Sequence, residues 1–370
     1  MATGPGQGSS SAEADLPYSR ATFVDEPAIP NYQTLHEKTP AVQEIRNLYR
    51  SNKWGFTHWH LALFYLFSKE VLAELKSNPQ AARECGDAAE LFGTFLTSGR
   101  IPISYELPAN PAPPAVHKRN RFRSHFGKGD GLQCVVTRRA VAVDQTHIVP
   151  FSVNSTTQNI AYVPPVLIIA ERLLGSSFTG HIEEVMTTCG GTDKIWNILP
   201  LTPYLHRLWD AYGLVGFKPC YIYAELAKSG QVAYIATFTF HWLLENGIQS
   251  LVIPEQLSAD ICLLMVEESE SFSEIKDNIF ESVYTRGRQP DGLTRLKDGH
   301  VCRVAFSRRH EAESMMRMLD LRWYASRLRC LAGGAGIDLF EPYDSDDSDS
   351  DYFVRTTEPW RIWDSSDGAA

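Results

Sequence analysis

The sequence lacks long apolar runs, closely spaced cysteine pairs and any excess of positive charge. The best apolar stretches, Val163 to Ala170 and Cys262 to Val266, fall well short of the roughly 20 residues that a membrane helix needs. The seven cysteines show no short repeated spacing, so we expect free thiols in a reducing compartment rather than a disulfide framework. The first residues hold neither a basic start nor an apolar run, which argues against a secretory signal. We therefore expect an intracellular protein, nuclear or cytoplasmic, without a membrane span.

The formal net charge of -9 argues at first against a nucleic-acid binder, because phosphate contacts are made by clustered lysines and arginines. The acidic residues are unevenly distributed, however. Many of them lie near the C-terminus: Asp344, Asp346, Asp347, Asp349, Asp351, Glu358, Asp364 and Asp367. Without this tail the body of the protein is much closer to neutral, so the net charge does not exclude a nucleic-acid partner.

Composition and hydrophobic spacing divide the chain into segments. Glycine, serine and proline dominate the start, which predicts an unfolded leader, and apolar residues at helical spacing follow from Val42. A proline-rich linker then separates this helical segment, for which a plain packing module is the simplest interpretation, from a central domain. The predicted segments are a disordered leader at 1–37, a helical segment at 38–107, the linker at 108–116, the central domain at 117–245, a C-terminal strand and helix extension at 246–336, and an acidic disordered tail at 337–370.

The central domain shows strand, strand and helix patterns in that order. Cys134 to Thr137 and Ala140 to Ile148 predict two strands joined by a tight turn near residues 138 and 139. After an irregular insertion, Asn197 to Leu201 leads into a helix that begins near residue 202, where threonine is a good cap and the next residue, proline, a good first helical residue. These patterns predict an α+β fold, a ββα core with an N-terminal helical segment, additional C-terminal strands and a final helix. The additional elements are expected around Tyr221 to Tyr223, Val232 to Phe240 and Gly299 to Phe306, with the last helix over Ala312 to Leu328.

A basic stretch with interleaved aromatic residues opens the central domain. It suits contact with phosphate groups, although a plain solvated helix face accounts for it equally well. Two more arginines follow at the predicted turn between the strands. The candidate nucleic-acid-binding residues are Lys118, Arg119, Arg121, Arg123, Lys128, Arg138 and Arg139.

Two histidines and an aspartate of the central domain have the chemistry of a phosphodiester hydrolase. That reaction needs a base to deprotonate water and a cation to neutralise charge on the phosphate and the leaving oxygen. His147 ends the second predicted strand, and an imidazole, with an ordinary pKa of about 6.5, is able to accept a proton. His206 and Asp210 are four residues apart on one face of the following helix, which suits them to hold Mg²⁺ or a similar ion.

Together these residues resemble the HNH endonuclease, or ββα-metal, family in the zinc-free variety found in fungal HNH nuclease domain proteins. The resemblance is carried by His147 followed by Ile-Val-Pro, by Asn197, and, after eight residues, by His206 followed by Arg-Leu-Trp-Asp; it covers about residues 117–245. It implies that His147 is the general base, that Asn197 pins the central loop of the catalytic centre and that His206 binds the metal. It also implies an endonuclease that hydrolyses nucleic acid, preferably DNA, with a divalent cation, Mg²⁺ or Mn²⁺.

Two positions depart from the family pattern. Many members place Asp or His directly before the base as a second metal ligand, whereas this chain has Thr146. Because side chains alternate along a strand, Asp144 points to the same side as Thr146, and we include it as a candidate metal ligand. The two Cys-x-x-Cys pairs of zinc-containing relatives are also missing. The positions of the first pair hold Cys134 and Thr137, and those of the second pair hold Thr202 and Leu205. No structural zinc is therefore expected.

Two other functions stay open. The threonine at position 146 is the main reason to consider a catalytically degenerate HNH module that binds nucleic acid or protein without cutting. The other alternative is a structural protein whose helical segment and last helix mediate assembly. Metal binding distinguishes the nuclease from the degenerate module, and nucleic-acid binding distinguishes both from the structural protein.

Overall fold

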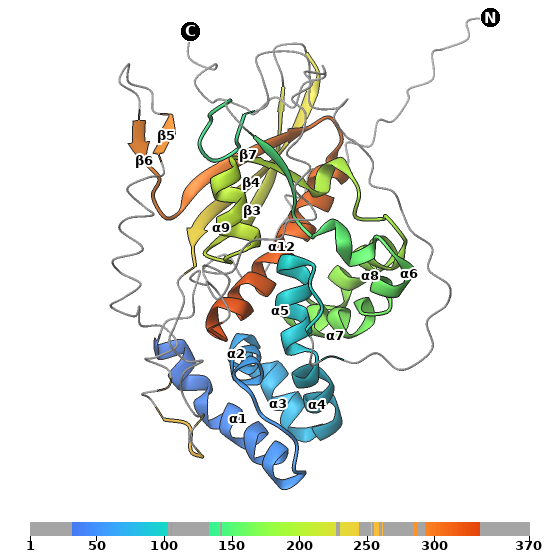
Figure 1. Cartoon of the computed structure of the whole chain (residues 1–370), viewed down its shortest axis with the longest axis vertical. Coiled ribbons are helices and arrows are strands. Elements are labelled where there is room, and N and C mark those ends of the chain that lie inside the picture. Colours follow the sequence, from blue (N-terminus) through green and yellow to red (C-terminus); the bar gives the residue numbers. More distant parts are fainter. Residues whose placement is uncertain are drawn as a thin grey trace, which may run out of the picture.

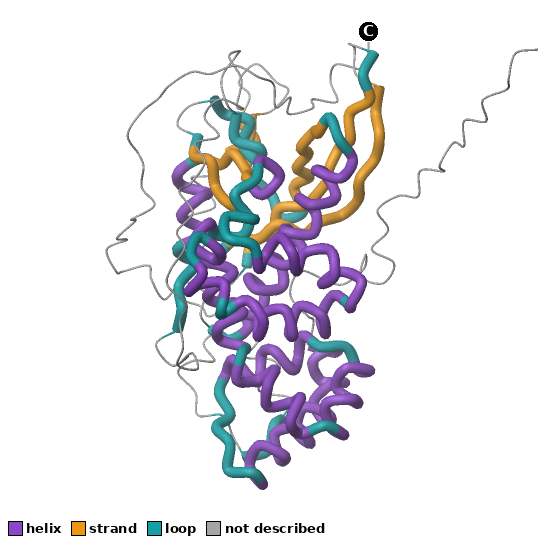
Figure 2. The backbone as a smooth tube through the Cα atoms, turned by 90° about the vertical axis from the view of Figure 1, so that its right-hand side faces the viewer, coloured by secondary structure: helices purple, strands orange, loops and turns teal. Residues whose placement is uncertain are grey.

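The computed structural model describes residues 32–102, 105, 133–140, 143–226, 230–243, 253, 255–258, 261, 284–286 and 293–333. Over these residues the chain has the predicted α+β architecture, with helices gathered toward one end and antiparallel sheets toward the other (Figure 1, Figure 2). Residues 1–31, the predicted linker at 108–116 and the predicted tail at 337–370 lie outside the described residues. None of the described helices is both long enough and apolar enough to cross a membrane.

The N-terminal part of the described chain is a group of short helices. They are α1 (Tyr32–Ser51), α2 (His58–Leu66), α3 (Lys69–Ser77), α4 (Pro79–Asp87) and α5 (Ala89–Ser98). Helix α1 begins within the range expected for the leader, because buried Leu35 extends its apolar face toward the N-terminus. Local signals bound the later helices: Ser68 and Asn78 cap α3 and α4 by accepting amide hydrogen bonds, and Gly99, with φ 70°, ends α5 in the left-handed conformation.

The ββα core is built from strands β1 (Asp144–His147) and β2 (Ile198–Leu201) and helix α9 (Pro203–Asp210). The two strands are antiparallel, and they pair His147 with Ile198. The helix begins as the sequence predicts, with the Thr202 hydroxyl accepting a hydrogen bond from the Leu205 amide and proline in the first turn.

The predicted strand over Cys134–Thr137 is wrong. This segment is a turn, closed by a hydrogen bond from the Arg138 amide to the Cys134 carbonyl, and Arg138 has a positive φ of 58°. The strand partner of β1 is instead β2, which lies on the far side of the insertion. Local alternation marks a strand but does not identify its partner, because pairing depends on tertiary packing.

The insertion between β1 and β2 is helical rather than irregular, which corrects the prediction. Its elements are the 3-10 helices η2 (Phe151–Asn154) and η3 (Ile195–Asn197) and the α-helices α6 (Thr157–Ile160), α7 (Val163–Leu174) and α8 (Ser176–Thr187). Two prolines near the start of α7 concealed the helix in the sequence, but proline is tolerated in a first helical turn. Gly175 separates α7 from α8 with a φ of 90°.

A three-stranded antiparallel sheet lies beside the core, with the strand order β3 (Val215–Leu226), β4 (Val232–Trp242) and β7 (His300–Phe306). A separate two-stranded antiparallel sheet pairs β5 (Tyr284–Arg286) with β6 (Leu293–Arg295). Phe217 packs edge-on against Trp209 of α9, whereas its neighbour Gly216 approaches Trp323 of the last helix, α12 (Arg309–Leu331). Because neighbouring strand residues point to opposite faces, α9 and α12 lie on opposite faces of β3.

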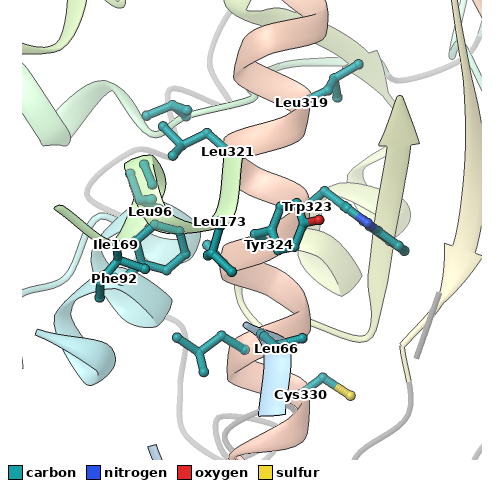
Figure 3. Packing of buried hydrophobic residues seen from close by; sticks show 14 of the residues in the cluster. Leu66, Phe92, Leu96, Ile169, Leu173, Leu319, Leu321, Trp323, Tyr324 and Cys330 are labelled. Carbon is teal, nitrogen blue, oxygen red and sulfur yellow. The ribbon is translucent and has the colours of Figure 1, made fainter. Parts of the chain in front are cut away.

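Helix α12 is the centre of the hydrophobic core. Its second half is buried on every side, and Figure 3 shows Leu321 and Tyr324 of this helix among Leu96 of α5 and Leu173 of α7. The predicted last helix is confirmed, and each end extends three residues beyond the predicted range. The buried stretch also carries the charged side chains of Asp320, Arg322, Arg327 and Arg329. Buried charges of this kind require polar partners, and Arg322 finds one in Asp210, the last residue of α9.

Candidate active site

A chain of polar contacts joins β1, α9 and α12. His206 of α9 lies between two carboxylates, with Nδ1 3.0 Å from Oδ2 of Asp144 and Nε2 3.0 Å from Oδ2 of Asp210. Arg322 of α12 donates to the other carboxylate oxygen of Asp210, Oδ1, at 2.7 Å. The structure therefore brings together all three predicted metal-site residues and adds a buried arginine from α12.

These contacts determine the charge states of the cluster. Burial by itself lowers the pKa of His206, but hydrogen bonds to Asp144 and Asp210 outweigh burial and raise its pKa to about 9. Burial by itself raises the pKa of the Asp210 carboxyl. The charge of Arg322 and the hydrogen bond to His206 outweigh burial, so that this pKa lies below its ordinary value. In the absence of a metal the protonated His206 ring therefore lies between the carboxylates of Asp144 and Asp210, and the Arg322 guanidinium contacts Asp210.

The residues around His206 fit a divalent cation in their chemistry, although they do not form a closed cage. Within the described ranges, no group of three or more histidine, cysteine, aspartate or glutamate side chains is positioned to hold one metal ion. His206 Nδ1 and Asp144 Oδ2 are 3.0 Å apart, and neighbouring ligand atoms of an octahedral shell with bonds of about 2.1 Å are also about 3.0 Å apart. Imidazole and carboxylate are both suitable ligands. The pair therefore fits two positions of a cation that keeps water on the others.

Asp210 differs from Asp144 in its surroundings. It contacts the opposite ring nitrogen of His206 and is held by Arg322, whereas the Asp144 side chain is 43% exposed and open to water. A carboxylate that accepts from the second nitrogen of a metal-binding histidine fixes the orientation of the ring. The geometry thus suits Asp144 for direct contact with a cation and Asp210 for orienting His206.

His147, at the end of β1, is almost completely buried and contacts a different carboxylate. Its Nε2 atom is 3.5 Å from Oδ1 of Asp193, a residue with no exposed surface, and its ring lies beside Phe151 at 5.9 Å between centroids. The two imidazoles therefore contact separate carboxylates: His206 contacts Asp144 at the start of β1, and His147 at the end of β1 contacts Asp193. A strand rises about 3.3 Å per residue, so the Cα atoms of Asp144 and His147, three positions apart, are separated by roughly 10 Å.

Asn197 joins the loop after β1 to the loop before β2. Its side chain accepts a hydrogen bond from the Val149 amide at 2.9 Å and donates to the carbonyls of Val149 and Thr192 at 2.8 and 2.9 Å. Its own carbonyl accepts from the Ile148 amide at 2.7 Å. These bonds hold the backbone that directly follows His147.

The basic residues are only partly described. Lys118, Arg119, Arg121, Arg123 and Lys128 lie outside the described residues. Arg139 is exposed on the turn, and Arg138 is partly buried. Burial and the nearby charge of Arg138 lower the pKa of His300 on β7, so Arg138 lies close to the sheet.

Two residues of the site escaped the sequence analysis, namely Asp193 and Arg322. Asp193 lies in a short stretch between two predicted elements. Arg322 lies within an apolar helical pattern, 112 residues from its partner Asp210. Neither residue belongs to a spaced motif, so no local pattern identified them.

Comparison with known proteins shows that the core is similar to one family. Residues 134–215 match the family model described as HNH endonuclease. This segment is therefore similar to HNH endonuclease domains, a class of nuclease that acts on nucleic acid with a divalent metal. Neither a curated protein nor a solved structure matches the chain.

Proposed function

We propose that the protein is a metal-dependent endonuclease that hydrolyses phosphodiester bonds of DNA inside the cell, in the nucleus or the cytoplasm. The observation that supports this most directly is the contact between Asp144 of β1 and His206 of α9, on the strand that ends at His147. It gives the HNH segment a two-residue cation pair at one end of β1 and an imidazole at the other. We expect a bound phosphate and its attacking water to lie between them.

Each residue has one task in this proposal. Asp144 and His206 hold the cation, and Asp210 keeps the His206 ring in place. When bound, the cation neutralises the charge on the phosphate and the leaving oxygen. His147 accepts a proton from the attacking water. Asn197 fixes the loop that follows His147.

The basic residues serve affinity rather than chemistry. Arginine and lysine contacts to phosphates position a nucleic acid without distinguishing its bases. We assign this task to Arg138, Arg139 and the basic stretch between residues 118 and 128, and we expect little sequence specificity from them.

A plasmid-nicking assay with a panel of divalent cations tests the proposal. The parent should convert supercoiled DNA to nicked or linear forms, and His147→Ala should lower the rate about 100-fold or more while circular dichroism and DNA affinity stay unchanged. His181→Ala, at an exposed histidine of α8, is the matched control and should cut like the parent. If His147→Ala cuts as fast as the parent, His147 is not the base.

A second function, a degenerate HNH module that binds without cutting, is favoured by one specific observation. Thr146 stands where many members have a ligand, and its side chain is buried at 1% exposure. Isothermal titration with Mg²⁺ and Mn²⁺ separates the two functions. Binding that is lost in His206→Ala and retained in His181→Ala supports the nuclease, whereas no binding by the parent supports the degenerate module.

A further inference from the structure

Asp193 is a buried carboxylate that the HNH motif does not assign. It has no exposed surface, and its Oδ1 atom is 3.5 Å from Nε2 of His147, which is itself almost fully buried. The distance is longer than a hydrogen bond, but contacts of this kind commonly tighten when substrate binds. At such a distance in a buried environment the charge of a carboxylate acts strongly on an imidazole.

The loop that carries Asp193 is fastened at several points. The Asp193 amide donates to the Gly190 carbonyl at 3.0 Å, and the Thr192 hydroxyl donates to Oδ1 of Asn154 at 2.6 Å. Asn197 holds the Thr192 carbonyl from the other side. A side chain at Gly191 would collide with the backbone oxygen of Val185, so glycine is required there. This loop is constrained by the same asparagine that holds the backbone after His147, which gives the carboxylate a defined place.

We propose that Asp193 is a positioning residue for His147, a role that rests on the proposed nuclease function. A carboxylate beside Nε2 favours the neutral tautomer that carries its proton on Nε2. Nδ1 then keeps the lone pair and is the atom that accepts the proton from water. The same carboxylate stabilises the imidazolium that results, without taking up the proton itself.

The proton transfer balances with groups already named. The O–H bond of the attacking water breaks as the Nδ1–H bond forms, and the resulting hydroxide oxygen bonds to phosphorus while the bond from phosphorus to the leaving oxygen breaks. His147 then returns its proton to the leaving group or to solvent. Asp193 remains a carboxylate throughout.

Kinetics of the full chain test the proposal with an isosteric substitution. Asp193→Asn should lower kcat about 10- to 100-fold and leave KM and DNA affinity within about twofold, because only the base is affected. The matched control is Asp298→Asn, since Asp298 also contacts a histidine, His241, at 3.0 Å, but on the sheet. Asp193→Asn should add nothing in a His147→Ala background, because the two residues act as one unit. A parent-like kcat in Asp193→Asn overturns the proposal.

A spectroscopic readout keeps the test valid even if the variant does not fold. In the native protein labelled with ¹⁵N-histidine, NMR should show neutral His147 protonated on Nε2. A proton on Nδ1 would overturn the assignment. If His147→Ala retains full activity, the nuclease mechanism itself fails; if His147→Ala is inactive but the tautomer is wrong, only the role of Asp193 fails.

Discussion

His206 shows how one side chain links stability to metal binding. Its two ring nitrogens lie 3.0 Å from carboxylates of Asp144 and Asp210, and these contacts raise its pKa to about 9. At neutral pH in the absence of metal the ring is therefore protonated. A cation that binds through Nδ1 must displace this proton, so metal binding and proton release are coupled.

The raised pKa of His206 predicts how the stability of the metal-free protein depends on pH. The folded pKa exceeds the ordinary value of 6.5, so the folded state binds the proton more tightly than the unfolded state. The extra stability is fully present below about pH 6.5 and is lost as the pH rises toward 9, with a total of about 3 kcal/mol. Urea unfolding in EDTA at a series of pH values measures it. His206→Gln should flatten the loss over this range, and an equal slope in both proteins contradicts the assignment.

Thr146 is the residue that departs most clearly from the family. It shares a strand face with Asp144, and no hydrogen-bond partner of its buried hydroxyl is found among the described residues. The position is therefore open to a substitution that supplies a ligand.

Thr146→Asp should tighten Mn²⁺ binding roughly tenfold, because an added carboxylate increases the charge of the ligand set. In the absence of metal the same substitution should lower the free energy of unfolding by about 1–3 kcal/mol, since it buries a charge. Isothermal titration and urea unfolding measure the two effects. Thr146→Val removes the hydroxyl without adding a ligand and should leave metal affinity unchanged; tighter binding by this variant would contradict the ligand role.

At the scale of elements, α12 completes the C-terminal end of α9. Arg322 donates to the Trp209 carbonyl at 3.2 Å, and Arg329 donates to the Asp210 and Ala211 carbonyls at 3.5 and 3.0 Å. Cationic side chains at the C-terminal end of a helix donate hydrogen bonds to its free carbonyl groups and interact favourably with the negative end of the helix dipole. The same arginines also reach α5, through the Leu96 carbonyl and the Thr97 hydroxyl. The last helix thereby ties the N-terminal helices to the HNH core.

Arg322→Met should lower the free energy of unfolding by about 3–5 kcal/mol, because it leaves the Asp210 carboxylate without its buried partner. It should also weaken Mn²⁺ binding, since Asp210 no longer holds the His206 ring in one orientation. Urea unfolding and isothermal titration are the measurements. Arg317→Met is the control on the same helix, where the contact with Glu313 is at 3.9 Å, and it should cost less than about 1 kcal/mol. Equal losses in the two variants would show that Arg322 has no special role.

At the level of the whole molecule, charge is unevenly distributed along the sequence. The basic stretch opens the central domain, whereas acidic residues gather beyond residue 336, and the full chain has a net charge of -9. An acidic segment competes with phosphate for basic residues and repels it, and salt screens both effects.

Removal of residues 337–370 should therefore tighten DNA binding at low salt, and the gain should vanish at high salt. Fluorescence anisotropy with a labelled duplex at several salt concentrations measures this. Neutralising Arg121 and Arg123 should have the opposite effect and reduce the salt dependence of binding. A truncated protein that binds like the full chain at low salt would show that the tail does not influence DNA affinity.

Elements whose signals are local were predictable from the sequence. The Thr202 cap, the first-turn proline and the four-residue spacing of His206 and Asp210 predicted α9 and its polar face, because capping and helical periodicity act within one or two turns. The position of His147 at a strand end and the last helix were predictable for the same reason.

The contacts between distant elements were not predictable from the sequence, because they depend on tertiary packing. Tertiary packing paired β1 with β2 across a helical insertion, brought Asp144 to His206 over 62 residues, and placed Arg322 on Asp210 over 112 residues. It also put Asp193 beside His147. No local periodicity encodes such contacts, since they follow from the packing of the whole core around α12 and from the need of buried charges for partners.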